Sequence, residues 1–146
     1  MFKHILISTD GSPVSNKAAK AGIALARALG AKVTPYCAIE ELQMIYGEGY
    51  FPTQTAIDGF VRRAREVAQK RVDAIGKMAK AAGVPFTSVV TKAYAPYEGI
   101  IDAAKKRKCD VIFMASHGRR GFSKLIMGSV TQKVLTHSRI PVVVYR

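Results

Sequence analysis

Short runs of mainly apolar residues recur along the chain and predict strands. They are rich in Val, Ile and other β-forming residues, and Gly, Pro, Asp or Lys bounds most of them. The runs lie at residues 3–9, 32–39, 85–91, 110–115 and 141–145. Apolar and polar residues alternate little at their centres, which is typical of strands buried on both faces of a parallel sheet. Pro35 removes a ladder donor from the second run, so we expect an edge or a bulge there.

Apolar residues at helical spacing occupy the segments between these runs. Ser12 suits the cap of a first helix, which ends at Gly30. A long second helix ends at Gly83, a third begins at Pro96, and a last helix covers about residues 130–137. The second helix carries one apolar stripe, formed by Ile57, Val61, Ala64, Val67, Val72, Ile75 and Met78.

Strands and helices therefore alternate along one domain, residues 1–146. Right-handed crossovers between successive strands predict an α/β fold, an open five-stranded parallel sheet with helices on both faces. In such a sheet, ligands bind at the carboxyl ends of the strands, where the strand order reverses.

The net charge changes this picture more than the composition does. Hydrophobic residues make up 49% and charged residues 23% of the chain, as in ordinary globular proteins. Lys and Arg outnumber Asp and Glu by 23 to 10, and the net charge of +13 attracts nucleotides, nucleic acids and acidic membranes alike. The basic residues are scattered and lack interleaved aromatic residues, which makes a nucleic-acid-binding module the weaker alternative. The chain starts without a signal-peptide pattern and contains no membrane-length apolar run, so we expect a cytoplasmic protein without a membrane partner.

The cysteines and histidines do not form a recognisable metal or disulfide pattern. Cys37 and Cys109 lie far apart, and His4, His117 and His137 are isolated from one another. We therefore expect buried thiols in a reducing compartment and no metal held by side chains.

Two polar segments follow the first and fourth strands, at residues 8–12 and 115–132. The second segment contains glycines that let backbone N–H groups approach a ligand, and it leads into the positively polarised N-terminus of the last helix. Both segments lie at the carboxyl edge of the predicted sheet, so together they predict an anion site. The residues that favour it are Gly118, Gly121, Gly128 and Ser129, with positive charge from Arg119, Arg120 and Lys124.

The same residues also have structural interpretations. Ser129 followed by Gln132 matches a capping box, and glycines suit turns. Arg119 and Arg120 also suit a solvated loop. Asp10 can accept from ribose hydroxyls or can simply shape the turn after the first strand. His117 alone is weak support for catalysis.

Familiar catalytic motifs are absent from the sequence. It contains no G-x-x-x-x-G-K-[ST], no G-x-G-x-x-G after the first strand, and no G-x-S-x-G. No pair of carboxylates stands beside the glycine-containing segment. The sequence therefore favours binding over fast catalysis and leaves slow ATPase activity open.

The opening ILISTDGS and the C-terminal ASHGRRG…MGSVTQKVLTHSRIPVVV resemble the universal stress protein family, and the resemblance covers the whole chain. The family's nucleotide signature, G-x2-G-x9-G-[ST], reads here as Ala115, Gly118, Gly128 and Ser129 at the same spacing. Ala115 replaces the first glycine, and its methyl group is expected to lower affinity without abolishing binding. The resemblance implies a Rossmann-like, adenine-nucleotide α-hydrolase-like fold. It also implies a stress-response sensor or regulator that binds ATP, or AMP or ADP, with Mg²⁺ or Mn²⁺ on the phosphates.

Carried over position by position, the resemblance implies contacts from both polar segments. Asp10 would contact the ribose, and Arg119 would add positive charge. The adenine pocket would be lined by Ser8, Thr9, Ala38 and Met114, and the phosphates would be held by Gly118, Gly128, Ser129, Val130 and Thr131. The resemblance also implies a homodimer through the last strand, at Val142, Val143 and Val144. An exposed apolar edge strand independently favours such pairing.

Other interpretations remain beside this one. A family member that does not bind nucleotide would act through protein–protein interactions. ATP pyrophosphatases have a similar sheet but carry SGGxDS after the first strand, whereas STDGS here lacks the paired glycines. Residues 40–52 contain several aromatic residues and are predicted to form a lid over adenine.

Overall fold

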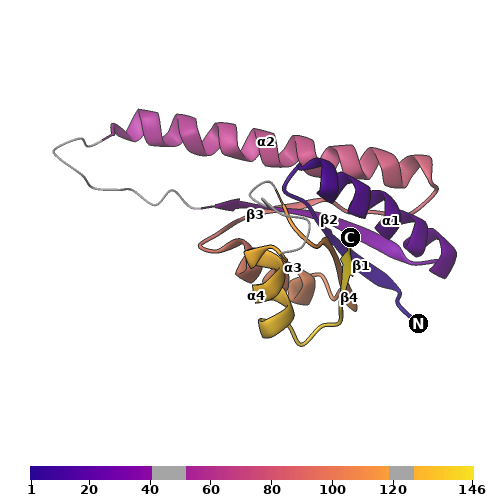
Figure 1. The fold of residues 1–146 in the computed structure, drawn as a ribbon. Coiled ribbons are helices and arrows are strands. Elements are labelled where there is room, and N and C mark those ends of the chain that lie inside the picture. Colours follow the sequence, from indigo (N-terminus) through magenta and orange to yellow (C-terminus); the bar gives the residue numbers. More distant parts are fainter. Residues whose placement is uncertain (41–51, 119–126) are drawn as a thin grey trace.

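The computed structural model describes residues 1–40, 52–118 and 127–146 (Figure 1). Strands and helices alternate in the predicted order. The strands are β1 (His4–Ser8), β2 (Lys32–Glu40), β3 (Val89–Ala93), β4 (Val111–Ala115) and β5 (Val142–Tyr145). The helices are α1 (Pro13–Leu29), α2 (Gln54–Ala81), α3 (Pro96–Lys106) and α4 (Ser129–His137).

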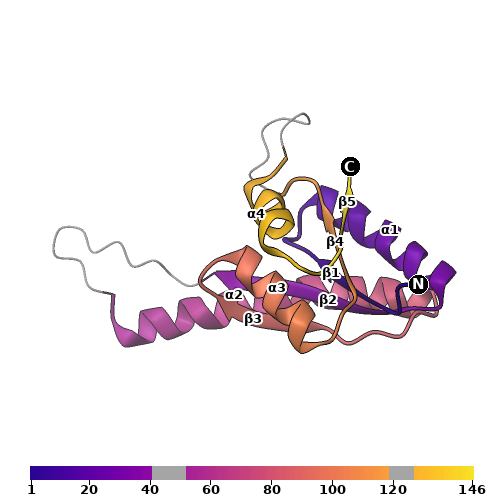
Figure 2. The same cartoon turned by 90° about the horizontal axis from the view of Figure 1, so that it is seen from below.

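The strands form one five-stranded sheet in the order β3-β2-β1-β4-β5, and all pairings are parallel. Helices α1 and α2 cover one face, and α3 and α4 cover the other (Figures 1 and 2). The chain winds outward from β1 in one direction to β3 and in the other to β5, so the strand order reverses between β1 and β4. This confirms the predicted fold and directs attention to the carboxyl ends of β1 and β4.

The strand residues alternate between two apolar layers. Ile5 and Ile7 pack with α1 on one face, whereas Leu6 packs with α3 and α4 on the other. All three side chains are fully buried. Burial on both faces explains why the sequence of β1 is an almost continuous apolar run.

The ends of α1 follow the sequence signals. The Oγ of Ser12 accepts a hydrogen bond from the Ser15 N–H at 3.1 Å, and Pro13 occupies the first turn. Gly30 ends the helix with φ of 63°, a left-handed conformation that glycine adopts without strain.

Pro35 lies in an interior strand, so the edge position is wrong. The backbone of Tyr36 faces β1, because its C=O accepts a hydrogen bond from the Thr9 N–H. Backbone hydrogen-bonding groups of successive residues point to opposite sides of a strand, so the backbone of Pro35 faces β3. The β3 ladder begins only at Val89, after an isolated bridge between Val33 and Phe86. The missing donor therefore falls in a break of the neighbouring strand. The strand predicted at residues 85–91 is correspondingly displaced toward Ala93.

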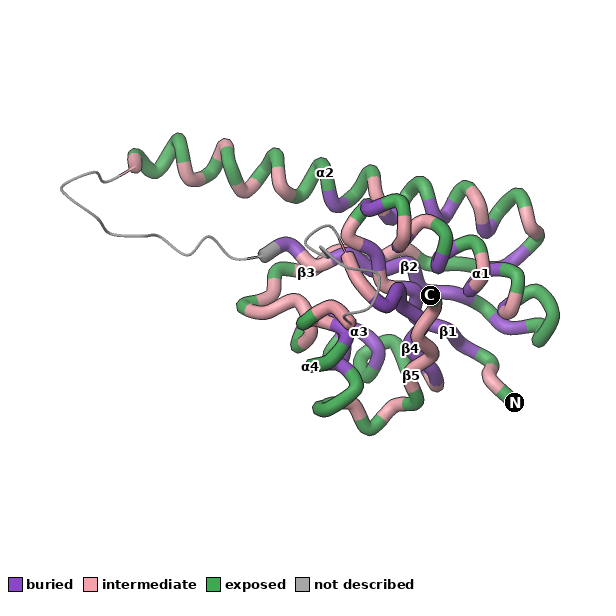
Figure 3. Tube along the Cα trace, in the orientation of Figure 1, coloured by how far each residue is buried: buried purple, intermediate pink, exposed green. Residues whose placement is uncertain are grey.

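Helix α2 extends well past the sheet. Its 28 residues are about 42 Å long at 1.5 Å per residue, and the buried ones lie in its C-terminal half (Figure 3). Val67 is 46% exposed although we placed it in the apolar stripe; Ala68 is buried instead. The lid predicted at residues 40–52 lies almost wholly outside the described residues, since 41–51 are not described.

Candidate functional site

The turn after β1 is held by its own side chains. Asp10 Oδ1 accepts from the Ser12 N–H at 2.9 Å, and Thr9 Oγ1 accepts from the Gly11 N–H at 3.0 Å. Thr9 Oγ1 also lies 3.1 Å from Ser15 Oγ. The hydroxyl of Thr9 is thus engaged inside the turn, whereas Asp10 directs its second oxygen toward the segment after β4.

Two glycines permit close approach around this turn. A Cβ on Gly118 would collide with Asp10 Oδ2, so glycine lets the segment after β4 lie directly against the carboxylate. Gly11 has φ of +79°, and a Cβ there would lie 2.6 Å from Arg71 Nε. The turn after β1 is therefore in contact with the segment after β4 on one side and with α2 on the other.

The start of α4 lies against the end of β4. The Gly128 N–H donates to Ser116 C=O at 2.8 Å, and Thr131 Oγ1 donates to Ala115 C=O at 3.0 Å. A Cβ on Gly128 would lie 3.2 Å from His117 Cα, so this approach also requires a small residue.

The capping box predicted at Ser129 is wrong. The N-cap residue is Gly128, no side chain caps the helix, and Gln132 Nε2 donates to Met127 C=O at 3.2 Å. Ser129, Val130 and Thr131 are the first three helical residues, and their N–H groups have no acceptor within the helix. The N-terminus of α4 thus offers backbone donors and partial positive charge to an anion.

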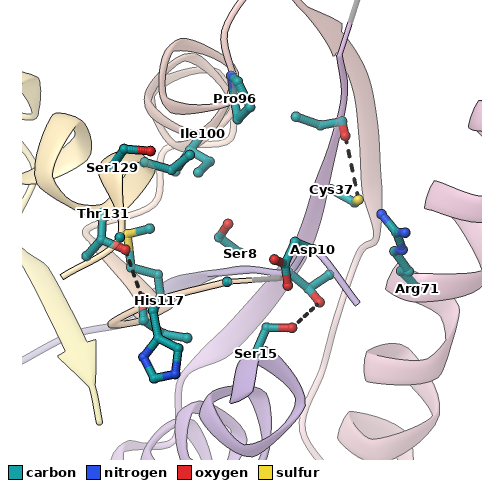
Figure 4. Close-up of a pocket in the computed structure, with 17 residues that line it drawn as sticks. Ser8, Asp10, Ser15, Cys37, Arg71, Pro96, Ile100, His117, Ser129 and Thr131 are labelled. Atoms are coloured by element: carbon teal, nitrogen blue, oxygen red, sulfur yellow. Dashed lines mark hydrogen bonds between the residues drawn. The ribbon is translucent and has the colours of Figure 1, made fainter. Parts of the chain in front are cut away.

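These elements enclose a cavity of about 230 Å³ at the carboxyl end of the sheet (Figure 4). Every predicted site residue in the described part of the chain lines it: Ser8, Thr9, Asp10, Ala38, Met114, Ala115, Gly118, Gly128, Ser129, Val130 and Thr131. Arg119, and with it Arg120, Gly121 and Lys124, lies outside the described residues.

Ala115, at the first position of the glycine signature, is 7% exposed. It belongs to the apolar cluster that contains Ile7 and Phe113 on the α1 face. The residue thus contributes to the core as well as to the wall of the cavity.

The cavity also has lining residues that sequence reasoning did not assign to it. They are Ser15, Cys37, Arg71, Pro96, Ile100 and His117. Cys37 precedes Ala38, and Pro96 begins the helix after β3, so both were close to expected positions. His117 Nδ1 lies 3.0 Å from Ser116 Oγ. Arg71 had no local signal, because only the packing of α2 beside β2 brings it to the site.

The potential metal-ligating side chains of the described residues lie apart from one another. No group of three or more His, Cys, Asp or Glu side chains is clustered among them. Cys37 and Cys109 are both buried, and burial raises the pKa of Cys109 to about 11. That thiol stays protonated and acts as a small apolar group. None of the described helices combines the length and apolar composition that a membrane span requires.

Distant structural neighbours include two that have an adenine nucleotide bound. A universal stress protein in complex with cAMP matches with a TM-score of 0.72 at 20% identity, covering 99% of this chain and 97% of that one. An Arabidopsis thaliana family protein with AMP bound matches with a TM-score of 0.68 at 12% identity, covering 97% of this chain and 90% of that one. At these sequence identities the structural similarity shows that the proteins share a fold.

More similar proteins connect the whole chain to one family. A universal stress protein of Thermus aquaticus is 32% identical over 146 residues, the full length of both chains. The structure of MJ0577 has a TM-score of 0.84 at 26% identity and covers 99% of this chain and 95% of that one. The sequence profile of the Universal stress protein family matches residues 1–146. The chain belongs to the universal stress protein family.

Proposed function

We propose that this chain binds an adenine nucleotide, ATP or its products ADP and AMP, and acts as a stress-response sensor or regulator. The observation that carries the proposal is the uncapped N-terminus of α4, held beside the Asp10 turn in one cavity. The family membership and the neighbours with cAMP and AMP support the choice of an adenine nucleotide.

Each part of the cavity suits one part of such a ligand. The amides of Ser129, Val130 and Thr131 suit the phosphates, because helix N-termini stabilise anions. Asp10 suits the ribose, because a carboxylate oxygen accepts from hydroxyl groups. The apolar surfaces of Met114 and Ile100 suit the adenine ring.

A divalent cation would accompany the phosphates rather than a cluster of protein ligands. Mg²⁺ commonly keeps several waters and binds substrate phosphates with few carboxylates. Asp10 is the carboxylate among the described lining residues, and no group of three or more His, Cys, Asp or Glu side chains occurs in the described part of the chain. We also propose the cytoplasm as the compartment, because its reducing conditions keep a buried thiol such as Cys109 reduced.

The proposal includes a homodimer formed through β5, which lies at one edge of the sheet. Ile112 N–H donates to Pro141 C=O, and Ser116 N–H donates to Tyr145 C=O. The backbone N–H and C=O groups of residues 141, 143 and 145 therefore point toward β4. Those of Val142 and Val144 point away from β4, toward the outer edge of the sheet. An apolar strand with an open edge suits pairing with a second copy.

Ser129→Asp tests the phosphate site, because its effects on binding and stability differ in sign. A carboxylate in the first turn of α4 should stabilise the helix by about 0.3–1 kcal/mol. The same charge should repel the ligand phosphates, and we expect ATP affinity to fall about tenfold or more. Ser129→Asn is the control of similar shape without the charge. Calorimetry measures affinity, and denaturant unfolding measures stability.

Two results would contradict the nucleotide proposal. One is the absence of heat and of a thermal shift when the wild-type protein meets millimolar ATP. The other is equal ATP affinity in Ser129→Asp and Ser129→Asn, since charge at the helix N-terminus would then not matter to the ligand.

A further inference from the structure

Arg71 brings a positive charge into the cavity from the side opposite α4. It lies in the C-terminal half of α2, and its side chain packs against Gly11, with Nε 2.6 Å from the position of a Cβ there. In Figure 4, Arg71 lies beside Cys37, with Ser129 and Thr131 at the far side of Asp10.

The guanidinium of Arg71 is available to a ligand. The residue is half-buried, and within residues 1–40, 52–118 and 127–146 it makes no hydrogen bond or ion pair. Asp10 lines the same cavity. A partly buried guanidinium with five unused donors favours a carboxylate or phosphate partner, which its planar fork can bind with two hydrogen bonds.

The sheet order sets the separation of the two positive regions. Cys37 is on β2, the Asp10 turn follows β1, and α4 packs at the end of β4. Neighbouring strands are about 4.8 Å apart, so the cavity spans about 10 Å from the β2 side to the β4 side. Arg71 comes from the α1–α2 face and α4 from the opposite face (Figure 2). One short 5′-phosphate group cannot occupy both regions with Asp10 between them.

We propose that Arg71 forms a second anion subsite, and that this cavity selects an adenine nucleotide with a further phosphate on a secondary ribose hydroxyl. This inference rests on the proposed nucleotide function. The 5′-phosphates lie at α4, Asp10 accepts from the remaining ribose hydroxyl, and the additional phosphate receives the guanidinium fork.

Calorimetry with three defined ligands tests the subsite: AMP, adenosine 2′,5′-bisphosphate and adenosine 3′,5′-bisphosphate. We expect one bisphosphate to bind the wild-type protein about tenfold or more tighter than AMP, because a charge-assisted hydrogen bond is added. Comparison of the two bisphosphates identifies the hydroxyl that carries the phosphate. Arg71→Gln should remove the gain, so that the preferred bisphosphate binds this variant no more tightly than AMP does.

Lys70→Gln is the matched control. Lys70 is the adjacent exposed cation on α2 and does not line the cavity, so its removal changes the net charge equally without removing the proposed contact. The variant should retain the full preference for the bisphosphate. An equal loss of preference in Lys70→Gln would show a long-range effect of net charge and overturn the subsite.

The remaining outcomes separate this inference from the proposed function. If AMP binds but neither bisphosphate binds more tightly, the subsite is wrong and the nucleotide function stands. If Arg71→Gln weakens AMP and the bisphosphates equally, Arg71 contacts the part they share, and the subsite is again wrong. If none of the ligands, ATP included, binds the wild-type protein, the proposed function itself fails.

Discussion

His4 is a buried histidine at the amino end of β1, far from the cavity. Its side chain is 9% exposed, and Nε2 lies 2.8 Å from Thr34 Oγ1. Burial, followed by the nearby charge of Lys32, lowers the pKa of His4 below its ordinary value of 6.5. The native state therefore holds this imidazole neutral, and the protein's stability depends on pH.

Acidification should lower the stability of the wild-type protein more than it lowers the stability of the His4→Gln variant. The unfolded chain gains a proton on His4 below about pH 6.5, whereas the folded chain resists protonation until a lower pH. The stability contributed by neutral His4 is thus complete above pH 6.5 and is lost as the pH falls toward the native pKa. Urea unfolding of both proteins at pH 7.5 and 5.0 measures this. Parallel losses in the two proteins would exclude His4 as the titrating group.

At the residue scale, local motifs were predictable and long-range contacts were not. Ser12 and Gly30 act in their own helix ends, so the sequence around them was sufficient. The spacing of Ser129 and Gln132 predicted Ser129 as the N-cap. In the structure Gly128 packs on residue 117 and is the N-cap, so the helix begins one residue earlier than predicted. Arg71 reaches the cavity from a helix whose packing partner lies elsewhere in the sequence.

Helix α2 consists of a packed half and a half that extends past the sheet. Thr53 caps its start by accepting from the Ala56 N–H, and Gln54 Nε2 donates to Asp58 Oδ1 at 2.9 Å. These local interactions stabilise the extended half, where the residues of the apolar stripe are half-buried or exposed (Figure 3). The C-terminal half is held by buried residues such as Val72 and Ile75.

Glycine-to-alanine substitutions should distinguish the two halves of α2. A Cβ on Gly59 has nothing within 4 Å, so Gly59→Ala should stabilise the helix locally by up to about 1 kcal/mol. A Cβ on Gly76 would lie 2.5 Å from Phe86 Cε2, and displacing that ring should cost about 1–3 kcal/mol. Amide hydrogen exchange along α2 and denaturant unfolding measure the two effects. A more stable Gly76→Ala variant would contradict the packing described.

The strands show where element-scale prediction ends. Apolar runs identified each strand that the structure describes, because burial on both faces leaves a compositional signal. The start of β3 was wrong, since residues 85–88 have strand-like composition but lie beside Pro35, which cannot donate to them. Boundaries of this kind depend on the neighbouring strand as well as on the segment itself.

At the scale of the whole molecule, alternation of strands and helices determined the topology and therefore the edge at which a ligand binds. Right-handed crossovers left few arrangements, and the glycine-containing segments after β1 and β4 met as expected. The shape and charge of the cavity on the β2 side were not predictable, because they depend on how α2 packs across the sheet.

The proposed β5 dimer leads to contrasting effects of proline at adjacent positions. Val144→Pro removes an N–H that faces away from the sheet, so it should abolish pairing with a second copy and largely preserve the fold. Val143→Pro removes an N–H on the β4 side and should instead destabilise the domain by about 1–3 kcal/mol. Light scattering measures the mass of each protein, and thermal unfolding measures its stability. A wild-type monomer at working concentrations, or an intact Val144→Pro dimer, would exclude β5 as the interface.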